Sequence, residues 1–207
     1  MTTATINDFT TETTSKAPDR IMPQKAGDKL WRPMFIMALM GFAVGMILAI
    51  VRSNLVSAGD DPLQVAALGQ YIPAAMFFGF AAVFGAISFA IAKILGEFRV
   101  GGGSVQEAVG GDVKTLKMPG TAKAFIVLMA MAMMIILAAV VLHVVAGINI
   151  GAGDWTEIQA EQWTIWLEAA RRFGTVLYLF AIMLGLVTIA KVIRYQTFRL
   201  RQVADRT

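Results

Sequence analysis

Two residue types that build reactive sites are almost missing from this chain. Its 207 residues include no cysteine and a single histidine. Without cysteine the chain has no disulfide, no thiol nucleophile and no thiolate ligand for a metal ion or an iron–sulfur cluster. One histidine also excludes any site that needs two imidazoles from the same chain. We therefore expect no catalytic residue and no metal site, and we expect that the chain is not an enzyme by itself.

Charged residues are scarce as well. They form 15% of the chain and hydrophobic residues form 57%, whereas an average soluble domain has about 25% and about 45–50%. The apolar residues gather in four stretches without Asp, Glu, Lys or Arg, at 33–51, 71–92, 124–150 and 173–190. About 20 helical residues cross the ~30 Å hydrocarbon core of a bilayer. The composition excludes a water-soluble enzyme and predicts an all-α integral membrane protein, with a four-transmembrane-helix bundle in residues 31–201.

The two ends of the chain are polar. Seven of the first fourteen residues are threonine, and no apolar periodicity precedes Trp31. Low hydrophobicity of this kind is typical of disordered segments. We therefore expect a disordered N-terminal tail over residues 1–30 and a short polar tail over residues 202–207.

Basic residues are distributed unevenly around the four stretches. Fifteen of the 18 lysines and arginines lie in residues 1–32, 93–123 and 191–207, and only three lie in 52–70 and 151–172. In multi-pass membrane proteins the cytoplasmic segments carry the excess of basic residues. The sequence thus predicts a multi-pass protein of the inner (plasma) membrane with both termini in the cytoplasm.

Small residues recur at helical spacing within the first two stretches. Lipid tails provide no hydrophobic drive for helix association, so close backbone contact between small residues has to supply it. The predicted helix-packing positions are Gly41, Gly45, Ala75, Gly79, Ala82 and Ala86, together with His143 in the third stretch. Two alternatives stay open: an ordinary contact within the bundle, or a face that binds another membrane subunit or a second copy of the chain.

Apart from the tyrosines Tyr71 and Tyr178, His143 is the only ionisable side chain inside the four stretches. Ionisable groups within a membrane are functional candidates by default. A proton relay needs a chain of such groups, however, and the stretches contain no carboxylate. Ligation of a single haem would need a methionine at similar depth, for which Met46 is the candidate. We expect a structural hydrogen bond from His143 and no cofactor, with haem ligation or a proton or substrate role as the alternatives.

Glycines are concentrated between the second and third stretches, at 101–103 and 110–111. Ser104 and Glu107 have the spacing of a capping box, and Gly110 suits a helix C-terminus. The pattern predicts a short helical turn between two flexible joints. No phosphate-binding loop is indicated, because the Lys and Ser/Thr of that motif are missing.

The residues after the fourth stretch are basic and apolar in alternation. Arg194, Arg199 and Arg201 are interleaved with Val, Ile, Tyr, Phe and Leu over residues 191–201. Anionic lipids of the cytoplasmic leaflet attract such segments. We expect an extension of the fourth helix near the lipid bilayer surface and no binding of nucleic acid.

Residues 155–170 have the pattern of an external amphipathic helix before the fourth stretch. Asp154 and Glu157 have the spacing of an N-cap and its N3 acid, and Gly174 offers a joint into the next span. Helices in the headgroup layer usually carry Lys and Arg on the polar face, whereas this one carries three glutamates. We expect an external docking surface, with a helix in the outer headgroup layer as the alternative. Its aromatic members are Trp155, Trp163 and Trp166.

The shortage of reactive side chains and the many small residues at helix-packing positions favour one class of function. We expect a non-catalytic multi-pass subunit that anchors or stabilises a larger inner-membrane complex, such as a respiratory or oxidoreductase complex. A small oligomeric transporter or channel is the alternative, although its spans would usually carry buried charges or broken helices. A single-haem membrane redox subunit is the third hypothesis.

The predicted orientation can be tested with reporter fusions. A reporter at Thr207 or within residues 101–118 is expected to read as cytoplasmic, because these positions belong to the segments rich in Lys and Arg. A reporter at Asp60 is expected to read as external. An external signal at Thr207 would mean that the number of spans is wrong.

Overall fold

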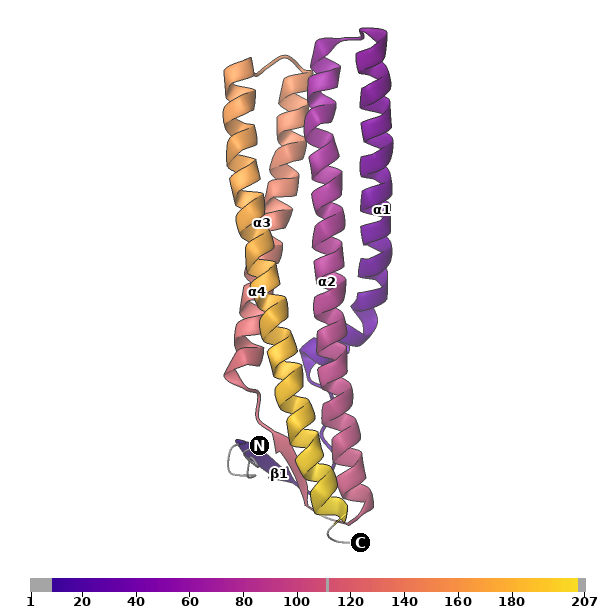
Figure 1. The fold of residues 1–207 in the computed structure, drawn as a ribbon, viewed down its shortest axis with the longest axis vertical. Helices are drawn as coiled ribbons and strands as arrows, with labels where there is room; N and C mark the ends of the chain where they lie inside the picture. Colours follow the sequence, from indigo (N-terminus) through magenta and orange to yellow (C-terminus); the bar gives the residue numbers. More distant parts are fainter. Residues whose placement is uncertain (1–8, 111, 205–207) are drawn as a thin grey trace. The chain divides into compact units, whose positions relative to one another are not determined.

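The computed structural model describes residues 9–110 and 112–204 of the chain. Their elements, in chain order, are β1 (Thr11–Thr14), α1 (Met22–Ala58), α2 (Pro62–Ala108), β2 (Val113–Leu116), α3 (Gly120–Gly151) and α4 (Glu157–Ala204) (Figure 1). The four helices include the four apolar stretches and are long and apolar enough to cross a membrane. Four long apolar helices that could span a membrane are therefore confirmed among the described residues. The short strands β1 and β2 are the departure from the all-α prediction.

The helices extend well past the stretches that predicted them. The longest, α4, has 48 residues and α2 has 47, which at 1.5 Å per residue is about 70 Å of helix for a hydrocarbon core of about 30 Å. The contacts of the chain form two compact units. The first comprises Met1–Trp31, Ile87–Val127 and Ala181–Thr207, and the second comprises Arg32–Ala86 and Leu128–Phe180.

The prediction of a disordered tail over residues 1–30 is corrected for the part that the structure describes. Strand β1 pairs antiparallel with β2, with Thr11 opposite Leu116 and Thr14 opposite Val113. Helix α1 then begins at Met22, where the side-chain oxygen of Gln24 accepts a hydrogen bond from the Ile21 amide at 3.1 Å. Residues 1–8 lie outside the described residues. The partner of β1 lies about a hundred positions along the chain. The composition of residues 1–30 alone could therefore not predict this strand.

The first unit joins this two-stranded ladder to α4. The Tyr195 hydroxyl donates a hydrogen bond to the Lys114 carbonyl of β2 at 2.8 Å. The Phe9 ring lies 5.4 Å from the Tyr195 ring and 5.8 Å from the Phe198 ring, centroid to centroid. Val113 and Tyr195 are almost fully buried. Aromatic contacts of this kind bury large apolar areas and hold β1 and β2 against the end of α4.

The second unit has a core of small and large side chains in alternation. Ala81 of α2, Ala132 and Ile136 of α3, and Tyr178 of α4 form its buried centre. The Tyr178 ring stacks on Phe84 at 4.9 Å, and its hydroxyl donates to the Met133 sulfur at 3.0 Å. The alanines let the three helices approach closely enough to enclose the tyrosine ring.

The glycine run 101–103 lies inside α2, so the prediction of flexible joints there is wrong. The Ser104 hydroxyl donates to the carbonyl of Val100, one helical turn back, and caps no helix. Helix α2 ends at Ala108, and Gly110 then has a φ of +69°, a conformation that favours glycine at a C-terminus. At Gly103 a Cβ would lie 2.6 Å from the Pro18 ring. Glycine there permits close approach of the N-terminal segment rather than flexibility.

The separate external helix over residues 155–170 is not confirmed, because α4 runs without a break from Glu157. Its cap is Thr156 with Gln159, not Asp154 with Glu157. The Thr156 hydroxyl accepts from the Gln159 amide at 3.3 Å, and the Gln159 side chain accepts from the Thr156 amide at 3.0 Å, which is a capping box. Gly174 is no joint: a Cβ there would lie 2.7 Å from Ile136 of α3.

Contacts within the second unit also fix the level of this segment. Gly174 faces Ile136 of α3, and α3 and α4 run antiparallel, so α4 residues 157–172 lie beside α3 residues of roughly 138–151. Those α3 residues belong to the apolar stretch 124–150. The amphipathic segment of α4 is therefore level with a predicted membrane span instead of lying beyond it.

Two neighbouring glycines of α2 give a matched test of the packing argument. Alanine at Gly101 meets no atom within 4 Å and should stabilise the protein by up to about 1 kcal/mol, because alanine is the better helix former. Alanine at Gly103 should destabilise it by about 1–3 kcal/mol, the usual range for overpacking. Thermal unfolding of the two variants in detergent measures both effects. Shifts of the same sign would contradict the assigned packing.

Candidate functional site

His143 takes part in a hydrogen-bond relay that joins three helices of the second unit. Its Nδ1 lies 2.9 Å from the side-chain oxygen of Gln70 in α2. The Gln70 amide nitrogen donates to the Thr164 hydroxyl of α4 at 2.8 Å, and that hydroxyl donates to the Ala160 carbonyl at 2.8 Å. The relay thus joins α2 to both α3 and α4 by hydrogen bonds, and the structural role of His143 stays a prediction.

The direction of this relay assigns the imidazole proton. A hydroxyl has one proton to donate, and Thr164 gives it to the Ala160 carbonyl. Its oxygen can then only accept from Gln70, so the amide oxygen of Gln70 faces His143 and Nδ1 must carry the proton. In the neutral imidazole Nε2 is then the nitrogen without a proton. It is buried without a hydrogen-bond partner among the described residues.

The surroundings of the imidazole are aromatic and cationic. Its ring stacks on Phe77 with centroids 6.4 Å apart, and the Arg171 guanidinium lies 3.9 Å from the centroid of the same Phe77 ring. Arg171 and Arg172 both form ion pairs with Glu168. The predicted haem partner Met46 is 62% exposed on α1, whereas His143 is 2% exposed.

Four of the small residues predicted for packing, Gly41, Gly45, Ala75 and Gly79, lie at the contact between α1 and α2. A Cβ on Gly41 would lie 2.8 Å from the Gly79 nitrogen and 3.2 Å from the Ala75 carbonyl, and one on Gly45 would lie 2.7 Å from the Met76 sulfur. Ala82 and Ala86 are buried, at 4% and 6% exposure. The structure brings Gly41, Gly79 and Ala75 together and places Gly45 one turn along the same contact.

The structure brings together only two of the three predicted docking tryptophans. Trp155 and Trp163 stack on each other with centroids 5.5 Å apart. Trp166 is 75% exposed and Trp163 is 41% exposed, whereas the neighbouring Leu167 is only 2% exposed. The apolar face predicted for this segment is therefore divided: Leu167 packs inward, and Trp166 points outward together with Ile158 and Ile165.

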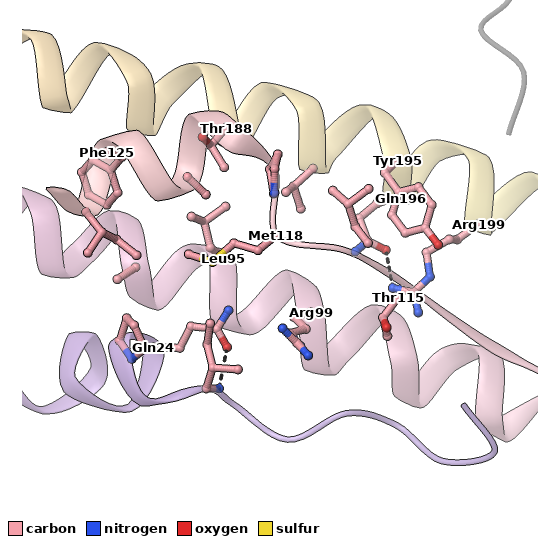
Figure 2. A pocket seen from close by; sticks show the side chains of 18 residues that line it. Gln24, Leu95, Arg99, Thr115, Met118, Phe125, Thr188, Tyr195, Gln196 and Arg199 are labelled. Carbon is pink, nitrogen blue, oxygen red and sulfur yellow. Dashed lines mark hydrogen bonds between the residues drawn. The ribbon is translucent and has the colours of Figure 1, made fainter. Parts of the chain in front are cut away.

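A second candidate site, absent from the sequence predictions, is a cavity of about 90 Å³ within the first unit. Figure 2 shows its two contrasting ends: Phe125, Leu95 and Met118 lie toward one end, and Arg99, Thr115 and Arg199 lie toward the other. Its walls come from α1, α2, the β2–α3 segment, α3 and α4. A pocket with apolar walls and a few converging polar groups has the usual character of a ligand site.

Within residues 9–110 and 112–204, the side-chain amides of Gln106 and Gln196 are the hydrogen-bond partners of the Arg199 guanidinium. Arg199 is 3% exposed; it donates to the Gln106 side chain at 2.7 Å and to the Gln196 side chain at 3.4 Å, and its ring neighbour is Tyr195. The sequence had marked Arg199 as one member of a basic stretch. Nothing in the sequence indicated Gln106 or Gln70, because each is a polar residue whose partner lies on a distant helix. Arg99 was not indicated either, because only the fold places it in the wall of this cavity.

The described residues hold no cluster of three or more His, Asp or Glu side chains that could bind a metal ion. No protein-family model, curated protein or solved structure matches the chain. The structural features that bear on function are therefore the relay and exposed surfaces of the second unit and the cavity of the first unit.

A double-mutant cycle tests the structural role of His143. Interhelical hydrogen bonds in membranes contribute about 0.6 kcal/mol on average and at most about 1.7 kcal/mol. His143→Leu and Gln70→Leu should therefore show a coupling energy in this range when unfolding is measured in detergent. His143→Asn, which keeps a hydrogen-bonding group, should be milder than His143→Leu. Complete loss of an associated activity in the Asn variant, with assembly unchanged, would instead point to ligation or proton transfer.

Proposed function

We propose that the chain is a non-catalytic multi-pass membrane subunit that anchors or stabilises a larger membrane complex. The observation that carries this proposal is a mismatch in the second unit. Exposed charged residues of α4 lie at the same level as an exposed apolar surface of α3. Arg172 is an example, with 77% of its side chain exposed.

The apolar half of this mismatch is extensive. On α3, Val141 is 60% exposed and Ile148 is 57% exposed, and on α1, Ile47 is 60% exposed and Ile50 is 59% exposed. These residues belong to the stretches predicted to lie in lipid. The polar half is on α4, where Glu161, Gln162 and Arg172 are exposed over the segment that faces the end of α3.

No single position of the membrane boundary suits both the apolar surfaces of α1 and α3 and the charged residues of α4. If the apolar surfaces of α1 and α3 lie in lipid, then Glu161 and Arg172 face hydrocarbon, where charged groups are expensive. If these charges mark the boundary, the apolar side chains of α1 and α3 face water. A partner subunit that presents polar groups to α4 relieves the first conflict, and one that covers the apolar surface relieves the second.

The continuity of α4 favours protein over lipid headgroups as the neighbour of this segment. A helix that lies in the headgroup layer has to turn into the membrane plane, and α4 has no break between Glu157 and Ala204. Trp166 and Ile165, at 75% and 62% exposure, project from a helix that continues into the fourth span. Large aromatic residues of this kind are common anchors of protein interfaces.

The orientation in the membrane follows from the basic residues. We infer that the termini and the 93–123 segment lie in the cytoplasm, because these segments hold most of the lysines and arginines. The proposed docking surface on α4 then lies at the opposite, external end. The partner is another membrane subunit or a second copy of this chain.

Replacement of Trp163 and Trp166 together with alanine tests the docking surface. Interface anchors cost about 2 kcal/mol or more when truncated, so recovery of the partner with the purified protein from native membranes should fall strongly. Site-specific photocrosslinking from position 166, followed by mass spectrometry, should identify the partner as another subunit or a second copy.

The matched control replaces Leu179 and Phe180 of the same helix, which are 54% and 53% exposed within the apolar stretch. We expect them to face lipid, so their replacement with alanine should leave recovery of the partner unchanged. Unchanged recovery in the tryptophan variant, with the protein correctly inserted, would refute the docking surface.

A further inference from the structure

We propose that the cavity of the first unit binds the phosphate group of an anionic membrane lipid between Arg99 and Arg199. The inference is independent of the docking surface on α4, because every residue that lines the cavity belongs to the first unit. It depends on the charge, the size and the position of the cavity.

The positive charge of the cavity is uncompensated. Its lining contains two arginines and no aspartate or glutamate. In the described part of the chain, Arg199 forms its hydrogen bonds with the side-chain amides of Gln106 and Gln196, and its Nε has no hydrogen-bond partner. The buried Nε of Arg99 also has none, and no ion pair of Arg99 is found within residues 9–110 and 112–204.

The acidic side chains nearby have partners outside the cavity lining. Asp28 pairs with Arg20 at 3.1 Å and with Lys93 at 3.0 Å, and Glu97 pairs with Arg20 at 2.7 Å. Glu107 accepts a hydrogen bond from the Ala17 amide at 3.0 Å. Two guanidinium groups in one cavity repel each other and lose hydration, so an anion from outside the chain is the partner that would satisfy them.

Guanidinium groups match a phosphate in shape as well as in charge. Their planar arrays of N–H donors bind phosphate oxygens in pairs, with charge-assisted hydrogen bonds. An apolar cavity of ~150 Å³ accommodates benzene. The present cavity of about 90 Å³ can therefore hold a compact group of a few heavy atoms, such as phosphate, but not a complete lipid.

The position of the cavity favours a lipid as the source of this phosphate. Ala92, Phe125 and Thr188, at the ends of three apolar stretches, line it together with Arg99, seven residues past Ala92 on α2. At 1.5 Å per residue Arg99 lies about 10 Å past the apolar stretch along α2. Basic pockets between transmembrane helices at this level bind lipid headgroups. The apolar end, with Leu95 and Phe125, suits the start of an acyl chain (Figure 2).

Arg99 gives the sharper test, because its replacement breaks no hydrogen bond or ion pair within the described residues. The purified full-length chain, delipidated in a neutral detergent, is titrated calorimetrically with short-chain phosphatidylglycerol. Arg99→Gln should weaken binding about tenfold, the effect of one charge-assisted hydrogen bond. The matched control is Arg194→Gln, which removes the same charge from an exposed position on α4 that does not line the cavity and should change the affinity less than about twofold.

Three further measurements separate the possible ligands and protect the test against misfolding. Arg199→Gln should also weaken binding, but it removes contacts to Gln106, so its thermal unfolding is measured in parallel. Ala122→Leu, which narrows the cavity while keeping both arginines, should reduce binding as well. Short-chain phosphatidylcholine should bind less tightly than phosphatidylglycerol, because its headgroup has no net charge.

Two results would overturn the proposal. Equal effects of Arg99→Gln and Arg194→Gln would show that general surface charge, and not the cavity, attracts the lipid. Inorganic phosphate that binds as tightly as phosphatidylglycerol and with the same dependence on Arg99 would show a site for a free anion and not for a lipid.

Discussion

Close approach of helix backbones is the constraint on which the second unit depends. Lipid gives helices no hydrophobic reason to associate, so contact has to come from surfaces without bulky side chains. Gly41 lies against Gly79, and Gly174 lies against Ile136 of α3. Each contact fixes how far one helix is shifted along another. The level of every other side chain in the unit follows from these shifts.

The relay from His143 to Gln70 and Thr164 is one result of this alignment. Hydrogen bonds between helices need donor and acceptor at the same depth, and three separate helices provide the three groups. The contrast between apolar α3 and charged α4 is another result. A shift of one helical turn would move Thr164 about 5.4 Å from its place beside Gln70. The small-residue contacts thus determine both the internal bonds and the outer surface that needs a partner.

Local patterns in the sequence were sufficient to identify the four helices. They were not sufficient to predict the strands or the packing of the segments between the helices. The apolar stretches predicted α1 to α4 because a charge-free run of about 20 residues has few alternatives to a spanning helix. Strand β1 could not be predicted, since its partner Val113–Leu116 lies far along the chain. The run Gly101–Gly103 was interpreted as flexible because glycine disfavours helix. The Pro18 ring beside Gly103 shows the packing reason for glycine at that position.

The same difference explains what was found and missed among the candidate sites. His143 was identified because an ionisable residue in an apolar stretch is conspicuous, and its structural bond was expected. Gln70 was missed because it lies just before the second stretch, where a polar residue carries no signal. The cavity was missed altogether, because its lining comes from five segments that only the fold assembles. Arg199 was noticed for its charge, but the sequence could not show that its neighbours are amides.

The arginines of the two units differ in their charged partners, and the difference has a functional meaning. In the second unit Arg171 pairs with Glu168, one turn away on the same helix, and rests on the Phe77 ring. Arg171 thus has a counter-charge within the chain, which it shares with Arg172. In the first unit Arg99 and Arg199 share a cavity without a carboxylate. A cation held away from water without a counter-charge is costly. The buried Arg199 and the half-buried Arg99 together therefore favour an anion that the chain does not itself supply.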